Sequence, residues 1–203
     1  CFELIKKRKF LLFIFWIFIA ATIHKSVVIF IPFYFIGSLK KFKFLCFISL
    51  LIFPINFFFK EKLFDVLEVL GFYENFDIFD GAGTFTFTVL YVLILVVGLI
   101  RVKYISSLYI NSKYYYNALS LGLFFLPLTW VNPSAMRIVQ FFSIFILILI
   151  PFIIESLKGI SKELNYLIVV FFIVLMILSF LNANINFEYK FFWQEMSLGK
   201  NYD

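Results

Sequence analysis

The chain has 203 residues, of which 64% are apolar and 15% are charged. Several apolar runs reach the roughly 17 to 25 residues that cross a bilayer, which excludes a water-soluble globular domain. The net charge of +6 does not indicate nucleic-acid binding, because the basic residues flank the apolar runs, where they report membrane orientation.

We therefore expect an all-α fold, a polytopic transmembrane helix bundle of about six or seven spans, because backbone polar groups in lipid must be satisfied within helices. Residues 1–203 are expected to form a single transmembrane domain. Cys1 and Cys46 have neither metal-ligand spacing nor a disulfide framework, so we expect no metal site and no cysteine chemistry. Because the chain begins with Cys1 and not Met, we expect a fragment that lacks its beginning.

The first apolar stretch, Phe10 to Gly37, is interrupted at His24-Lys25-Ser26. It is either one long tilted helix or, as we favour, a hairpin of two short helices that meet at this polar tip. Basic residues flank both outer ends, which places those ends in the cytoplasm. Each arm is shorter than a usual span, so tilt, bilayer thinning or shielding by neighbouring helices is required.

Five longer apolar runs follow: Phe42–Phe59, Thr84–Ile100, Tyr114–Val131, Arg137–Ile154 and Leu164–Leu181. Together with the two arms of the hairpin they give seven predicted crossings. In this topology most basic residues are cytoplasmic, and those outside are Lys25, Lys60, Lys62, Arg137, Lys190 and Lys200. Aromatic residues at the two ends of the third run predict anchors at the headgroup levels: Tyr114, Tyr115, Tyr116 and Trp130.

Residues 60–83 form a predicted acidic external loop. Leu63, Val66, Leu67 and Leu70 recur at helical spacing, with charged residues between them and Gly71 as a stop. This pattern is typical of a helix that lies along the membrane interface.

Arg137 stands at the outer start of a predicted span, with Gln140 one turn further along the same face. The guanidinium matches the oxygens of a lipid-linked diphosphate, which makes Arg137 a candidate catalytic residue and Gln140 a candidate substrate-binding residue. The alternative is an anchor whose charged end reaches the headgroups.

His24 and Lys25 lie at the hairpin tip on the same outer side, and His24 is the one histidine of the chain. The imidazole could orient an acceptor hydroxyl or assist proton transfer, with Lys25 as a substrate-binding neighbour. The alternative is an interfacial histidine that caps a helix break.

The external loop carries Glu74, Asp77 and Asp80 at intervals of three, beside Tyr73. Such carboxylates and aromatic rings bind sugars, so Asp77 is a candidate general base and Tyr73, Glu74 and Asp80 are candidate substrate-binding residues. A solvated acidic face is the competing interpretation.

Three segments resemble EpsG-type (Wzy-like) exopolysaccharide and O-antigen polymerases. Residues 20–32, AATIHKSVVIFIP, look like the family's "fH-x-sali" element. Arg137-Ile138-Val139-Gln140-Phe141-Phe142 resembles its Arg-led, aromatic-rich helix start, and Tyr189-Lys190-Phe191-Phe192 resembles the tyrosine-bearing tail after its last span. The resemblance covers this chain but only the C-terminal half or so of a family member.

The resemblance implies a glycosyltransferase-type enzyme that joins undecaprenyl-diphosphate-linked oligosaccharide repeat units at the outer face of the bacterial inner membrane. It implies no cofactor and no nucleotide sugar. The expected partners are that lipid-linked oligosaccharide, membrane lipids, and a chain-length regulator and flippase of the same pathway. Arg137 would steady the diphosphate leaving group, while His24 or a loop carboxylate would orient or deprotonate the acceptor hydroxyl.

Three alternatives stay open. A lipid-linked glycan ligase uses the same donor with another acceptor. A polysaccharide transporter or flippase is favoured by the broken first stretch and opposed by the position of ionisable residues at span ends. A non-catalytic membrane subunit would need none of the polar residues on the outer face.

Overall fold

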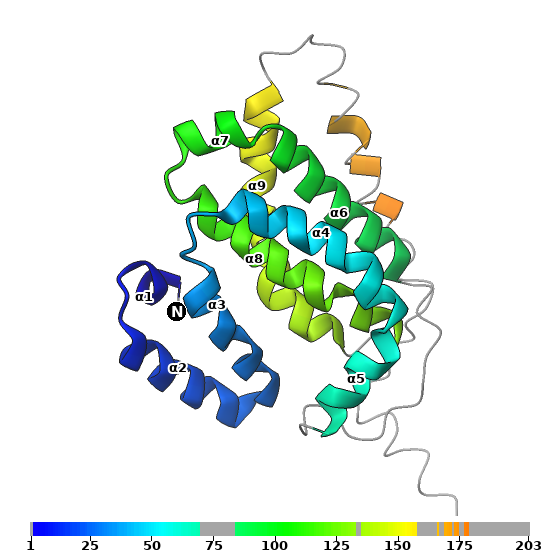
Figure 1. The fold of residues 1–203 in the computed structure, drawn as a ribbon. Coiled ribbons are helices and arrows are strands. Elements are labelled where there is room, and N and C mark those ends of the chain that lie inside the picture. The colour runs from blue at the N-terminus through cyan, green and yellow to red at the C-terminus, as the bar shows by residue number, and fades with distance from the viewer. Residues whose placement is uncertain are drawn as a thin grey trace, which may run out of the picture.

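The computed structural model describes residues 2–69, 84–132 and 135–157, together with a few short helical pieces between 166 and 178. All regular structure within these residues is helical, as predicted. The bundle is drawn in Figure 1.

The N-terminal part is the predicted hairpin. A short α1 (Phe2–Lys6) precedes α2 (Phe10–Ile23), and the chain returns through the 3₁₀-helix η1 (Lys25–Phe30) and α3 (Ile31–Ile36). The arms are held together by aromatic side chains: the Tyr34 ring lies 5.0 Å from that of Phe10 and 5.1 Å from that of Phe13, between centroids. The stretch is therefore two short helices and not one long tilted helix.

The rest of the bundle consists of α4 (Phe42–Phe58), α5 (Lys60–Val69), α6 (Phe85–Ile100), α7 (Val102–Leu108), α8 (Ser112–Phe125), the 3₁₀-helix η3 (Leu126–Trp130) and α9 (Met136–Leu157). Helix α8 lies at its centre, in contact with α3, α4, α6, α7 and α9. Two hydrogen bonds tie α6 to α8 across the apolar interior: Tyr91 Oη donates to the carbonyl of Leu119 at 2.9 Å, and Tyr116 Oη to that of Gly98 at 2.6 Å.

Hydrogen bonds join the segment that follows α3, at the C-terminal end of the hairpin, to helix α8. The Asn117 side chain of α8 is fully buried, and its Nδ2 donates to the carbonyls of Gly37 at 2.9 Å and Leu39 at 3.0 Å. Phe30 of η1 packs on α9, with its ring centroid 5.7 Å from that of Phe142. The tip of the hairpin is thereby held against the first turns of α9.

Helix α9, with 22 residues, is long and apolar enough to cross a membrane by itself, and an 18-residue window within it has a mean hydropathy of 2.5. Two pairs of helices are long and apolar enough only when the two helices of each pair are counted as one bent span. These are α4 with α5, bent by 84°, and α6 with α7, bent by 75°. Length and composition therefore give one span, or up to three, within the described residues. The protein is a helical membrane protein; the count of six or seven spans stays a prediction.

The predicted span Tyr114–Val131 differs from the structure. Helix α8 begins earlier, at Ser112, and gives way to η3 at Leu126. Pro127 sits in the first turn of η3, where its missing N–H and fixed φ are tolerated, whereas an α-helix interior would lose a hydrogen bond. Most of the predicted span Leu164–Leu181 lies outside the described residues.

The interpretation of the tyrosine cluster as headgroup anchors was wrong for two of its members. Tyr114 is 7% exposed and Tyr116 is fully buried. Successive helical residues point about 100° apart, so three in a row cannot share the lipid-facing side. Trp130 is half-buried, and its Nε1 donates to Thr88 Oγ1 at 3.0 Å.

Candidate functional site

A pocket of about 430 Å³ opens between the hairpin tip and the first turns of α9. The residues that line it are His24, Arg137, Gln140, Phe141 and Ile144. Three of the polar candidates predicted from the sequence, on segments more than a hundred residues apart, thus meet in one place.

Helix α9 supplies four of the five lining residues. Arg137, Gln140, Phe141 and Ile144 are spaced by three, one and three, which aligns them on one face of a helix. Arg137 and Gln140 are exposed and lie in the first two turns, where unpaired backbone N–H groups give the helix a partial positive charge. The polar end of the pocket therefore favours an anion.

His24 is held in place by its backbone. It has an extended conformation (φ −144°, ψ 103°) between α2 and η1. Its N–H donates to the carbonyl of Ala20 at 2.9 Å, and its own carbonyl accepts from the N–H of Val27 at 3.1 Å. These two hydrogen bonds complete the last turn of α2 and the first turn of η1. They fix the backbone of His24 and thereby the position from which the imidazole extends.

The His24 ring has a neighbour that sequence reasoning did not single out. Ser26 is 4% exposed, and its Oγ lies 3.3 Å from Nδ1 of His24. The apolar lining residues Phe141 and Ile144 were also missed, although their spacing from Arg137 is the signal that could have identified them.

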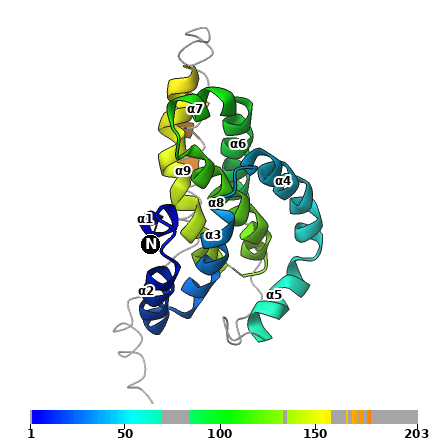
Figure 2. The ribbon, with the colours of Figure 1, turned by 60° about the vertical axis from the view of Figure 1, so that its left-hand side comes forward.

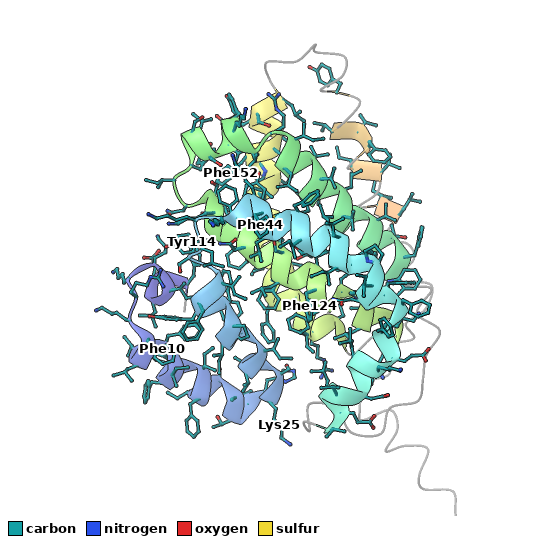
Figure 3. All side chains as sticks on the ribbon, in the orientation of Figure 1. Phe10, Lys25, Phe44, Tyr114, Phe124 and Phe152 are labelled. Atoms are coloured by element: carbon teal, nitrogen blue, oxygen red, sulfur yellow. The ribbon has the colours of Figure 1, made fainter. Side chains whose placement is uncertain are left out.

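Of the remaining candidates, only Lys25 is among the described residues. Lys25 is exposed at the tip of the hairpin, where Figure 3 labels it. It is not among the residues that line the pocket. Tyr73, Glu74, Asp77 and Asp80 lie outside the described residues. The segment that contains them joins α5 to α6, and α5 lies at the same end of the bundle as the hairpin tip in Figures 1 and 2.

Arg137 differs from the arginine at the opposite end of the bundle. The Arg101 guanidinium donates to the carbonyl of Ser156 in the last turn of α9, where a cation complements the helix dipole. Arg137 makes no hydrogen bond or ion pair within the part of the chain that the structure describes. Its side chain lines the pocket.

No group of three or more potential metal ligands occurs among the described residues. The polar side chains that line the pocket can donate hydrogen bonds: the Arg137 guanidinium, the Gln140 amide and the His24 imidazole. Phe141 and Ile144 add an apolar wall directly beside these donors.

The sequence is similar to one family of known proteins. A family model described as the EpsG family matches residues 1–193, nearly the whole chain. The comparisons with curated proteins and with solved structures gave no match.

Proposed function

The chain belongs to the EpsG family, and on this basis we propose that it is a polysaccharide polymerase of the bacterial inner membrane, with several membrane-spanning helices. Its substrate is an oligosaccharide repeat unit linked to undecaprenyl diphosphate, and the reaction occurs at the outer face. The glycosidic bond to the diphosphate breaks at the sugar C1, which forms a bond to an acceptor hydroxyl oxygen. The hydroxyl proton is released, and undecaprenyl diphosphate leaves.

The pocket between η1 and α9 supports binding of the diphosphate. The planar fork of Arg137 can donate two parallel hydrogen bonds to phosphate oxygens and keeps its charge at any relevant pH. Gln140 adds an amide donor on the same face of α9. Stabilising the charge that develops on the leaving group is the main way in which such donors accelerate a transfer reaction.

The apolar wall of the pocket is evidence that the substrate carries a lipid chain. Ile144 is 57% exposed, and Phe141 is half-buried beside it. A prenyl chain attached to a diphosphate at Arg137 can follow these side chains along α9 into the membrane. A soluble sugar nucleotide would have no use for that surface.

The acceptor sugar is assigned to the acidic segment that joins α5 to α6. Asp77 is the proposed general base, and Tyr73, Glu74 and Asp80 are proposed to bind the sugar, with Lys25 at the hairpin tip. Their position in the chain, directly after α5 at the pocket end of the bundle, supports this assignment.

The test is complementation of cells that lack the parent gene with full-length wild type or Arg137→Ala, with polymer length read on gels and membrane levels checked by blot. We expect Arg137→Ala to abolish long polymer and to accumulate single repeat units at a normal protein level. Arg8→Ala is the matched control. Arg8 is exposed and lies shortly before the first residue of α2, whereas His24 of the pocket follows the last residue of that helix.

The other outcomes are equally informative. Polymer of normal length in Arg137→Ala would indicate that Arg137 is a membrane anchor and does not bind the diphosphate. Normal polymer in the deletion itself would exclude a polymerase, and accumulation of repeat units on the cytoplasmic side would indicate a flippase.

A further inference from the structure

His24 has two possible roles in the pocket, and they need opposite states of its ring. A general base needs a ring nitrogen with a free electron pair facing the substrate, whereas an anion-binding residue needs a ring N–H there. Nδ1 of His24 lies 3.3 Å from Ser26 Oγ, so Nε2 is the nitrogen that remains for the pocket.

Ser26 decides between the two states. Its hydroxyl is buried, and His24 Nδ1 is the partner that its side chain has in the described part of the chain. A buried hydroxyl proton requires an acceptor, and Nδ1 provides one only when it carries no proton. The neutral ring then has its proton on Nε2. In the protonated ring both nitrogens carry protons, so Nε2 donates in that state as well.

We infer that Ser26 is a positioning residue that holds His24 as a hydrogen-bond donor, and that Nε2–H binds an anionic oxygen in the pocket beside Arg137. This inference rests on the proposed function for the identity of that oxygen, a phosphate oxygen of the lipid-linked diphosphate. It removes His24 as the base that deprotonates the acceptor hydroxyl and leaves that task to a carboxylate such as Asp77.

The tautomer can be measured without any assay of activity, because the chain contains a single histidine. In full-length protein labelled with ¹⁵N-histidine and purified through a histidine-free tag, the pair of imidazole nitrogen signals that disappears in His24→Gln belongs to His24. At a pH where the ring is neutral, we expect a protonated Nε2 and an unprotonated Nδ1. Ser26→Ala should shift the signals towards a mixture of tautomers. A protonated Nδ1 in the wild type would overturn the inference.

The role in the reaction is tested with membranes that contain the variants. His24→Gln keeps an amide donor but cannot act as a base, so we expect it to retain most of the polymerisation rate. His24→Ala should lose roughly tenfold or more, as expected for a lost hydrogen bond to a charged group. Equal loss in both variants would identify a base and contradict the inference.

Ser26 acts through the imidazole only if its effect disappears with the ring. We expect Ser26→Ala to slow polymerisation severalfold in the wild type and to have no further effect in the His24→Ala background. The same loss in both backgrounds would assign Ser26 a merely structural role. Failure of the proposed function is seen separately, as normal polymer in the gene deletion, and it leaves the tautomer measurement intact.

Discussion

Tyr116 illustrates how a polar side chain serves the interior of an apolar bundle. The residue is fully buried, its ring stacks on Phe42 at 5.4 Å between centroids, and its hydroxyl bonds the Gly98 carbonyl at the end of α6. Its neighbour Tyr115 is half-buried and packs on Phe145. Two adjacent tyrosines therefore have different roles because the helix turns them to different sides.

This difference predicts the effect of removing each hydroxyl. Tyr116→Phe leaves a buried carbonyl without its donor and should lower the free energy of unfolding by about 1 kcal/mol. Tyr115→Phe is the matched control and should have little effect, since no hydrogen bond of Tyr115 occurs in the described residues. Unfolding of the purified proteins in detergent measures both. Equal stability of the two variants would contradict the buried hydrogen bond.

At the scale of elements, the close packing of α8 depends on a glycine. A Cβ added at Gly122 would overlap the hydroxyl of Tyr91 on α6 and would lie 2.9 Å from Cβ of Phe142 on α9. At Gly98 of α6 an added Cβ would lie 3.2 Å from the Tyr116 ring and 3.3 Å from Leu149 Cδ2, so a small shift accommodates it. Small residues allow helices in membranes to approach closely.

Alanine at these two glycines should therefore have unequal effects. Gly122→Ala forces α6 and α9 away from α8 and should cost about 1–3 kcal/mol, as overpacking does. Gly98→Ala should be close to neutral, because the helix propensity of alanine offsets a mild contact. Thermal unfolding in detergent tests this order, which would be refuted by a Gly98→Ala variant that is the less stable one.

At the scale of the whole molecule, the bundle has two distinct ends. In Figures 1 and 2 the hairpin tip and α5 lie at one end, and α7 lies at the other. Lys25 and Lys62 are exposed towards the first end, while Lys103 is exposed on α7. Because most basic residues flank the opposite ends of the predicted spans, we predict that the first end, which contains the pocket, lies at the outer face of the membrane.

Cysteine labelling can test this orientation. In a background with Cys1 and Cys46 replaced by alanine, Lys25→Cys and Lys62→Cys should react with a membrane-impermeant maleimide in intact cells. Lys103→Cys should react only after the cells are opened. Labelling of Lys103→Cys in intact cells, with protection of the other two, would invert the orientation and place the pocket in the cytoplasm.

Several features of this protein followed from the sequence by itself because they depend on neighbouring residues. The length of the apolar runs determined a helical membrane protein. The polar triplet at His24 determined the break in the first stretch, and the spacing of Arg137 and Gln140 placed them on one face of α9. Each of these features depends on the helical spacing of residues within one segment, or on a polar break within one apolar run, so no contact between segments is needed to predict it.

Only the tertiary structure decided which segments meet. It placed His24 of the hairpin against Arg137 and Gln140, separated Lys25 from them, and buried Tyr116 against Gly98. It also revealed the apolar wall of Phe141 and Ile144 and the Ser26 contact with the imidazole. Such neighbours result from the packing of side chains on separate helices, and helical periodicity shows which face of a helix is apolar but not which helix covers it.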